Sequence, residues 1–524
     1  MSAREQTLPS SRPARATLRE WLGLALLLLP MLALATDLTV LFFALPAISA
    51  DLEPSSSQLL WITHVYGFLI AGFLVTAGRL SDRIGPRLLL LIGSAFFAVL
   101  SLAAAYAQTA EGLIIARAAL GIAGATLMPA LFSLLRAMFG DDTQRRLAIA
   151  IAFSAFTVGG AIGPVLGGLL LEYFWWGAVF LVNIPPLVAL LLAGPRLLPE
   201  RAERNRTRID PISVALSVTG MLVIVYGLQE LAAGRSAEGG PVWLQLLCVL
   251  AGSGILVLFL RRQGRIREPL FDLAILGSRQ VRVALVTLLL MGIGVTGMFY
   301  LFTQYLMLVA GLTPLRAGLW TLPYIVANIA GAMLAPGLAR RWPPAMVVAA
   351  ALLVAAGGAV GLAALAGPAA SAAPIVAAIS VVGWGQGAAG ALVSDLIIAG
   401  APEEKTGSAA SAQEVGGELG TALGIAAAGV IGIAAYRHYL TGHLPGTVSG
   451  SVGRALSSGM HEGVTVVGRL SVGDPVLPAV VDAAVGFGIQ VFAGIGAVVL
   501  ALTAGLILYA HRNEQRRARP VCVG

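Results

Sequence analysis

The chain alternates long runs of apolar residues with short polar segments from one end to the other. Most of these runs come close to the ~20 residues that a helix needs to cross ~30 Å of hydrocarbon. Each run therefore predicts a membrane-spanning helix. Fourteen such runs occur, at residues 21–45, 58–77, 88–108, 111–134, 147–171, 177–195, 211–231, 242–260, 282–309, 315–338, 345–366, 374–400, 407–434 and 482–510.

The basic residues between the runs fall mainly on one side of the predicted membrane. With the N-terminus in the cytoplasm, 28 of the 34 Lys and Arg residues lie in inward segments. Five lie in outward segments, and one, Arg117, lies within a run. Because cytoplasmic loops of membrane proteins carry an excess of Lys and Arg, and because the number of runs is even, both termini are predicted to be cytoplasmic.

Composition agrees with a protein whose solvent is lipid. Hydrophobic residues make up 58% of the chain and charged residues only 11%, against ~25% charged in a typical soluble domain. The net charge of +8 follows from the loops that flank the runs, so no nucleic-acid partner is expected. The two cysteines, Cys248 inside an apolar run and Cys522 in the tail, are not expected to form a structural disulfide or a metal site.

The spacing of the runs predicts two similar halves and an inserted pair of helices. The first run is too long for a cleavable signal peptide and is expected to remain as a helix. A weak repeat relates the segments that follow the second and tenth runs, and repeated halves are the usual architecture of secondary transporters. The expected parts are a cytoplasmic arm (1–20), a six-helix bundle (21–195), an inserted helix pair with basic linkers (196–281), a second six-helix bundle (282–510) with an external loop (435–481), and a cytoplasmic tail (511–524).

A glycine-rich segment in the fifth run is the most specific motif of the chain. It reads GGAIGPVLGG and contains Gly159, Gly163, Pro164, Gly167 and Gly168. Small residues let another helix approach closely, and proline removes one helical hydrogen bond and bends the helix. The segment resembles the antiporter motif GxxxGPxxGG of the fourteen-helix drug:proton antiporter family, within the major facilitator superfamily. The resemblance implies a hinge between two halves, whereas a lone GxxxG also arises from plain close packing.

The segment after the second run resembles the cytoplasmic loop signature of that superfamily, GxLaDrxGrr. It contains Gly78, Asp82, Arg83 and Gly85. By this resemblance, Asp82 binds a helix N-terminus or a basic side chain when the cytoplasmic ends of the halves meet, and so latches the inner gate. Pro86 lies where the family usually has a basic residue, so fewer charged groups are expected to interact at the inner gate. A solvated loop that only sets topology is the alternative.

Charged residues inside the runs are the candidates for coupling. Arg117 lies in the fourth run and matches the family signature RxxxGxgaa, which implies a part in proton transfer; Asp37 falls at the family's motif in the first run. Because an unpaired guanidinium costs at least ~2.5 kcal/mol inside a membrane, Arg117 is expected to face a polar cavity or a carboxylate. An ion pair that only orients helices is the alternative.

Two acids in the thirteenth run, Glu414 and Glu418, match the family's paired-acid segment. Since they are four residues apart, they share one helix face. Two carboxylates that close cannot both ionise cheaply in a low dielectric, so at least one is expected to hold a proton near neutral pH, as a proton carrier must. Asp395 lies near a cytoplasmic helix end, where a headgroup-facing position explains it.

Aromatic and polar residues supply the candidate substrate contacts. Trp61 and Tyr66 in the second run, Gln304 in the ninth run and the carboxylate of Asp37 suit a lipophilic cation, through cation–π attraction and apolar contact. Aromatic residues near the ends of spans also anchor helices at the membrane interface. His64 is a further candidate, as a pH-sensing group.

Together these features predict an all-helical membrane protein, and the family resemblance implies the major facilitator fold and a proton-coupled antiporter that exports lipophilic cationic or amphiphilic compounds. The partners are small substrates, protons and the lipid of a bacterial cytoplasmic membrane, and the protein is expected to be a monomer without cofactor or metal. No Walker loop or catalytic constellation occurs in the sequence, so an enzyme is not expected. The alternatives are a dedicated exporter of one native metabolite, lipid or self-made antibiotic and, more remotely, a non-transporting membrane sensor.

Overall fold

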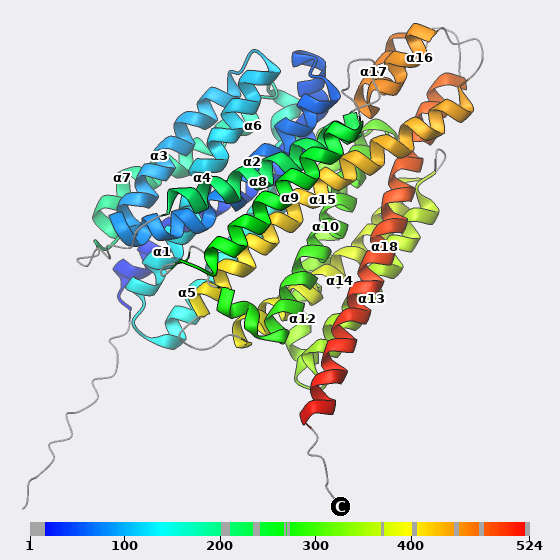
Figure 1. Ribbon diagram of the computed structural model, residues 1–524. Helices are drawn as coiled ribbons and strands as arrows, with labels where there is room; N and C mark the ends of the chain where they lie inside the picture. The colour runs from blue at the N-terminus through cyan, green and yellow to red at the C-terminus, as the bar shows by residue number, and fades with distance from the viewer. Residues whose placement is uncertain are drawn as a thin grey trace, which may run out of the picture.

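The computed structural model describes residues 16–200, 210–233, 242–266, 269, 273–367, 371–400, 406–444, 450–470 and 476–518, and every regular element among them is helical. The helices form one elongated bundle (Figure 1). They are α1 (Leu18–Leu52), α2 (Ser56–Ile84), α3 (Pro86–Ala105), α4 (Ala110–Met138), α5 (Asp142–Tyr173), α6 (Ala178–Leu181), α7 (Ile184–Leu197), α8 (Pro211–Ala233), α9 (Val242–Gln263), the 3-10 helix η1 (Leu273–Gly277), α10 (Arg279–Leu308), α11 (Pro314–Trp320), α12 (Leu322–Ala339), α13 (Pro344–Leu365), α14 (Ala372–Ala399), α15 (Thr406–His443), α16 (Gly450–Ser458), α17 (Met460–Leu470) and α18 (Val476–Ala518).

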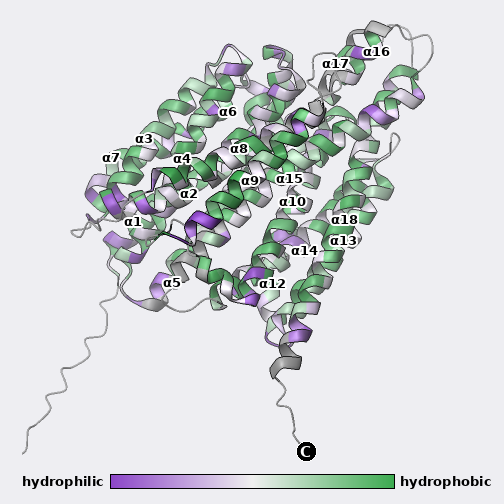
Figure 2. Ribbon diagram, viewed as in Figure 1, coloured by the Kyte–Doolittle hydropathy of each residue, from purple (hydrophilic) through white to green (hydrophobic). Residues whose placement is uncertain are grey.

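Length and hydropathy support a membrane-spanning bundle. Thirteen helical segments of the described chain are long and apolar enough to cross a membrane. Figure 2 shows hydrophobic residues along the shafts of the helices and hydrophilic residues gathered mainly toward their ends. The all-helical prediction is confirmed. In the predicted seventh span, α8, the described apolar stretch is the shorter segment Pro211–Ile224, so the count of fourteen spans stays a prediction.

Several boundaries differ from those that the apolar runs predict. The segment expected to be a loop from Gly78 is helical as far as Ile84, and only Gly85 separates α2 from α3. The loop prediction was wrong because polar residues continue a helix beyond the apolar core, where the backbone still forms its own hydrogen bonds. Gly85 ends α2 with a positive φ of 98°, a conformation that glycine adopts at little cost.

Prolines divide two predicted spans into two helices each. The run at 177–195 forms α6 and α7, and Pro185 and Pro186 lie in the first turn of α7. The run at 315–338 forms α11 and α12, which meet at Thr321 just before Pro323. Proline is accepted at a helix start because the missing N–H would have no intrahelical partner there.

The helices pack in two groups. The first contains α1 to α7, in which α1 packs on α5 and α7, and α4 packs on α2 and α3. The second contains α10 to α15 and α18, in which α14 packs on α12 and α13, and α10 packs on α15 and α18. This packing supports the division into two halves, and the domain boundaries given above stay a prediction.

The helices α8 and α9 pack on each other, and α8 also contacts α2 and α15. An ion pair joins them at one end: Arg262 Nε lies 2.7 Å from Asp210 Oδ2, and Arg262 Nη2 lies 3.1 Å from Oδ1. These hydrogen bonds from the guanidinium lower the pKa of Asp210 to about 2. The pair therefore ties the ends of the two helices together throughout the physiological pH range.

Several described contacts between the two halves lie toward the outer side, defined here as the side opposite the N-terminus. The Gln304 side chain donates to the Phe42 carbonyl over 3.2 Å. A Cβ added at Gly429 of α15 would lie 2.5 Å from Leu60 Cδ2 of α2. Phe42 lies in the last third of α1 and Leu60 near the start of α2, and the short link between these helices lies on the outer side. The described contacts therefore close the outer side.

A cysteine-labelling experiment tests the predicted orientation. On a background of Cys248→Ala and Cys522→Ala, we expect Thr441→Cys to react with a membrane-impermeant maleimide in intact cells. Trp342→Cys should react only after permeabilisation, because it follows α12 on the side that carries most basic residues. Both side chains are exposed, and neither substitution changes the charge of the loops. Labelling with the opposite sidedness at both positions would reverse the topology.

Candidate functional site

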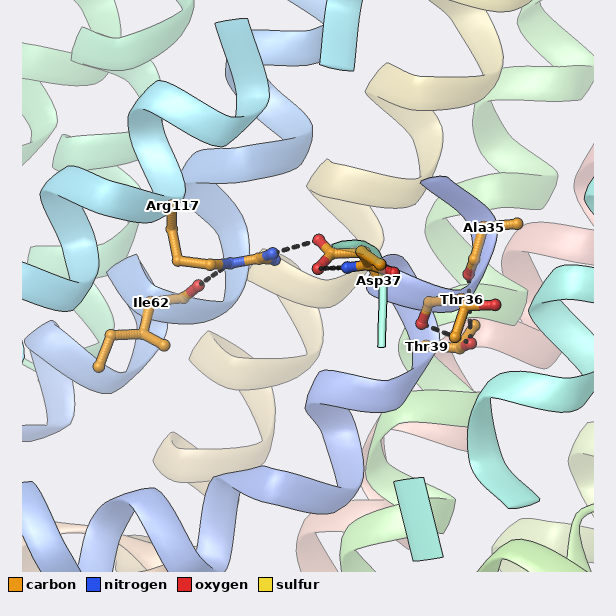
Figure 3. Close-up of polar contacts among 7 residues, drawn as sticks. Ala35, Thr36, Asp37, Thr39, Ile62 and Arg117 are labelled. Carbon is orange, nitrogen blue, oxygen red and sulfur yellow. Dashed lines mark hydrogen bonds and ion pairs between the residues drawn. The ribbon is translucent and has the colours of Figure 1, made fainter. Parts of the chain in front are cut away.

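A buried ion pair joins α1 and α4 inside the first half of the protein. Arg117 Nη1 lies 2.6 Å from Asp37 Oδ2, and the two side chains are 1% and 0% exposed. Figure 3 shows the Arg117 side chain reaching from its helix toward the carboxylate, with the carbonyl of Ile62 beside it. That carbonyl accepts a hydrogen bond from Arg117 Nε over 3.3 Å. The expectation that Arg117 faces a carboxylate is met.

Other side chains complete the surroundings of the pair. Asn183, at the start of α7, donates from Nδ2 to Asp37 Oδ1 over 2.9 Å. The guanidinium carbon of Arg117 lies 4.2 Å from the centre of the Tyr66 ring and 5.9 Å from that of Phe180. A guanidinium over an aromatic face is attracted by the quadrupole of the ring. Groups of α2, α6 and the start of α7 thus surround the arginine of α4 and the carboxylate of α1.

The chemistry of this arrangement follows from its burial. The opposite charges cancel, and each is costly without the other, because water cannot replace the missing partner. Protonation of Asp37 removes the attraction and leaves Arg117 as an uncompensated buried charge. A proton on Asp37 would therefore remove the main reason for α1 and α4 to keep this arrangement. Asp37 already accepts hydrogen bonds from two donors in this conformation.

The glycines of the α5 motif lie against α1, next to Asp37. A Cβ at Gly159 would lie 2.8 Å from the Leu32 carbonyl oxygen, and one at Gly163 would overlap the Thr39 hydroxyl. A Cβ at Gly167 would lie 2.8 Å from Val40 Cγ2. The hydroxyl of Thr36, the residue before Asp37, donates to the Gly159 carbonyl over 3.2 Å. The motif therefore sets the position of the α1 segment that carries the carboxylate.

The outer end of the same motif contacts the other half. A Cβ at Gly168 would overlap the backbone of Leu315, and one at Gly318 would overlap the carbonyl of Pro164. Leu315 and Gly318 lie in α11. Because both close approaches are to backbone atoms, neither helix can accept a side chain there without moving. One segment thus connects the ion-pair site with the contact between the halves.

The predicted substrate residues have different surroundings. Tyr66 is fully buried and packs on Arg117 and Phe97. Trp61 lies in a cluster with Phe68, Met221 and Ala426, where α2, α8 and α15 meet. Gln304 is 1% exposed and contacts Phe42 of the first half. In this conformation, Tyr66 accompanies the ion pair, whereas Trp61 and Gln304 lie between the halves.

The inner-loop motif lies at the end of α2. A Cβ at Gly78 would touch only Pro129 of α4, at 3.9 Å, and Arg83 is exposed. The backbone of Asp82 belongs to α2, and its side chain is outside the described part of the chain, as are the side chains of Glu414 and Glu418 on α15. The inner latch and the paired-acid site stay predictions. Within the described residues, no group of three or more His, Cys, Asp and Glu could hold a metal ion.

Sequence reasoning missed Asn183 as a partner of Asp37. The signal was present, because Asn183 is a lone amide between apolar stretches and directly precedes the turn that contains Pro185 and Pro186. A buried amide needs hydrogen-bond partners as much as a buried charge does. The partner lies 146 residues away in the sequence, so only the fold identifies it.

Comparison with known proteins points to one family. Residues 27–425 match the Major Facilitator Superfamily. The chain is 42% identical over 426 residues to the multidrug efflux pump LfrA of Mycolicibacterium smegmatis, covering 81% of this chain and 83% of that protein. It is 30% identical over 503 residues to the methyl viologen resistance protein SmvA of Salmonella typhimurium, covering 95% and 100%. A tetracenomycin C resistance and export protein of Streptomyces glaucescens is 32% identical over 422 residues, covering 79% of this chain and 77% of that protein.

Solved transporter structures share the fold. A bacterial homologue of the human lysosomal transporter Spinster, in an inward-facing and unoccupied conformation, superposes with a TM-score of 0.66 at 15% identity, over 97% of this chain and all of that one. The nucleoside transporter NupG superposes with a TM-score of 0.59 at 10% identity, over 93% and 99%. At these identities the likeness concerns the fold alone.

The buried pair makes a prediction about stability. We expect Asp37→Ala to lower the free energy of unfolding by about 3–5 kcal/mol, because it leaves the Arg117 charge buried without a partner. Adding Arg117→Met should restore much of the loss, since no charge remains. Thermal unfolding of purified protein in detergent measures both. The pair would be unimportant for the fold if Asp37→Ala unfolded at the wild-type temperature.

The close approach at Gly168 makes a prediction about movement. We expect Gly168→Val to hold α5 away from α11, to open the outer side, and to reduce turnover at least tenfold with correct insertion. Gly160→Val is the matched control, because Gly160 lies in the same motif and an added Cβ there comes no closer than 4.0 Å to another group. Cysteine accessibility at the outer side and transport rates measure the two effects. Equal effects of both substitutions would show that the close approach of Gly168 to α11 is not the cause of the loss.

Proposed function

Because the chain belongs to the major facilitator superfamily, we propose that it is a proton-coupled antiporter that exports lipophilic cationic and amphiphilic compounds by alternating access. It is a multi-pass protein of the bacterial cytoplasmic membrane, and the family to which it belongs transports small molecules. The names of its relatives support this substrate class, since methyl viologen is a dication and LfrA is a multidrug pump. We propose that it works as a monomer.

The observation that carries the proposal is the buried pair of Asp37 and Arg117. In the outer-closed conformation, Arg117 neutralises Asp37. A lipophilic cation or a proton can replace Arg117 as the partner of this charge, but the site holds only one compensating charge at a time. Competition of this kind is what an antiporter requires, because binding of one ligand lowers the affinity for the other.

Arg117 has other groups to hold it when Asp37 is occupied. The Ile62 carbonyl and the Tyr66 ring contact the guanidinium independently of the carboxylate. Both belong to α2, so release of Asp37 leaves Arg117 attached to α2 and frees α1 to move against α5. Tyr66 thereby contributes to coupling, while Trp61 and Gln304 offer an aromatic face and an amide to the substrate once the halves separate.

The acids of α15 form the second part of the proposed coupling. Glu414 and Glu418 are spaced to lie on one helix face, so the state in which the pair holds one proton is more favourable than the state in which both carboxylates are ionised. We assign the transported proton to Glu418, assisted by Glu414. The adjoining glycines Gly416 and Gly420 face Leu288 and Leu289 of α10, which places this segment at a close helix contact.

Movement in the proposed cycle uses the glycine motif of α5 as the hinge. Closure on the outer side brings Gly168 and Pro164 against α11, and closure on the inner side brings Asp82 and Arg83, at the end of α2, toward the second half. Gly78 and Gly85 flank these residues, and Gly85 supplies the positive φ at the junction with α3. The two contact sets exclude each other because the halves tilt as rigid bodies.

A second candidate, export of one native compound, is favoured by part of the comparison. A relative from Streptomyces carries the name of a single antibiotic, tetracenomycin C, and another that of puromycin. A dedicated exporter would respond to one chemical class, whereas Coulomb attraction of Asp37 for any lipophilic cation has little shape requirement.

Transport by purified protein tests the proposed function. In proteoliposomes with an imposed pH gradient, we expect wild-type protein to move methyl viologen and ethidium against their gradients, with proton movement in the opposite direction. Glu418→Gln should reduce this exchange to the level of empty liposomes, because the amide keeps the volume and loses the proton site. A fluorescent pH indicator and the dye signal give the two fluxes.

Asp395→Asn is the matched control, since Asp395 is an exposed acid of the adjacent helix α14. We expect it to transport at the wild-type rate. Full exchange by a Glu414→Gln and Glu418→Gln double variant would exclude the paired acids. Response to a single neutral or anionic compound, with none to cations, would favour the dedicated exporter.

A further inference from the structure

His64 is a buried histidine in the middle of the membrane-spanning part of α2. Its side chain is 1% exposed, and Nδ1 lies 2.6 Å from the carbonyl oxygen of Leu60. A carbonyl only accepts hydrogen bonds, so Nδ1 carries the hydrogen and, in the neutral ring, Nε2 carries a free lone pair. Among the described residues, Nε2 has no hydrogen-bond partner. The ring therefore presents an unused proton acceptor.

The position of His64 places this acceptor in the seam between the halves. Leu60 and Phe68 lie four residues before and after it, so all three share one face of α2. Leu60 reaches Gly429 of α15, and Phe68 packs with Ala426 of α15. The His64 ring stacks on that of Phe68, with centroids 6.3 Å apart. The described contacts that close the outer side thus enclose the imidazole.

Charged groups of neighbouring helices lie near this part of α2. Arg117 of α4, a cation, donates a hydrogen bond to the carbonyl of Ile62, two residues before His64. At the outer end of α2, Glu111 of α4 accepts a hydrogen bond from Gln58, and Glu230 of α8 accepts one from Ser57.

Two further sets of groups complete the surroundings. Asp37 of α1 lies beyond Arg117 and is paired with it. The α15 side chains that cluster with Phe68 are apolar: Ala426, Leu419 and Leu423. The side chains of Glu414 and Glu418, on the inner part of α15, are outside the described part of the chain. A protonated imidazole in the closed seam would be a second positive charge beside Arg117 without water.

We propose that His64 is a proton-binding residue of the outer gate, neutral while α2 and α15 are in contact and protonated from the external medium when they separate. The closed seam then requires His64 to release its proton, so external acid favours the outward-open conformation. The inference rests on the proposed function only in that the two halves alternate, and it adds a proton site separate from the Asp37 pair and the α15 acids.

The size of the effect follows from the ordinary titration of imidazole. A histidine in water is half protonated near pH ~6.5, so at pH 5.5 about ten hydrated His64 rings are charged for each neutral ring. If only the neutral form closes the seam, the ratio of open to closed molecules rises about tenfold between pH 7.5 and pH 5.5.

A distance measurement between the outer ends of the halves tests the proposal. Spin labels at Gln108→Cys and Ser371→Cys, on the Cys248→Ala and Cys522→Ala background, report outer opening by double electron–electron resonance in nanodiscs. Both positions are exposed. Gln108 lies in the link between α3 and α4 of the first half, and Ser371 lies just before α14, in the link that follows α13 of the second half. Without drug or gradient, we expect the long-distance population to rise about tenfold relative to the short one on acidification, as calculated for imidazole titration.

Variants separate His64 from other titrating groups. His64→Gln should abolish the pH response, and His64→Leu should abolish it and also favour the closed seam at both pH values, because no buried acceptor remains unsatisfied. His443→Gln is the matched control: His443 makes the same contact from Nδ1 to the carbonyl four residues before it, Tyr439, at 2.9 Å, but is exposed. It should keep the wild-type response.

The outcomes are distinguishable from those of the transport assay. A wild-type protein whose outer distance does not change with pH overturns the proposal, as does a full response in either His64 variant. Neither result depends on export of any compound. Failure to export cations, with the pH response of the outer distance intact, would instead overturn the proposed function and leave the gate residue in place.

Discussion

The rest of the structure depends on the attraction between Asp37 and Arg117 in a region without water. Each charge alone would cost several kcal/mol at this depth, and together they cost little. The pair therefore requires α1 and α4 to stay in one register, and α2, α6 and α7 surround it with Ile62, Tyr66, Phe180 and Asn183. A charge pair of this kind adds little to stability, but it is sensitive to its surroundings, because a single proton or cation on Asp37 would remove its attraction to Arg117.

Close backbone contact links the charge pair to the contact between the halves. The side of α5 that faces α1 is built from glycine at every fourth position, Gly159, Gly163 and Gly167, and the next residue, Gly168, lies against α11 of the other half. Because no side chains lie in between, a shift of α1 would move α5, and α5 would move α11, without first rearranging side chains. In the membrane, where apolar burial does not drive helices together, such packing is the main cohesive term.

Much of this could be predicted from the sequence. The features that could not be predicted share one cause. Apolar run length identifies the spans because the bilayer sets it, and Arg117 and Asp37 stand out because charges are rare inside the runs. Their pairing, and the amide of Asn183, depend on contacts between residues far apart in the chain. The expected loop at Gly78 proved helical as far as Ile84, because hydropathy marks where the apolar core ends and not where the backbone hydrogen bonds end. The roles of Glu414, Glu418 and Asp82 stay predictions.

The helix α2 connects the charge pair with the outer gate through its two faces. Tyr66 and the Ile62 carbonyl lie against Arg117 of α4, while Leu60, His64 and Phe68 lie toward α15. A rotation or tilt of α2 that followed Arg117 would also move the seam, because the residues of both faces belong to one rigid helix. Conversely, a proton on His64 would weaken the seam and change the electrostatic surroundings of Arg117 from the other side. By linkage, each site would then affect the other by the same free energy, so the proposed gate and the charge pair would be coupled and not independent.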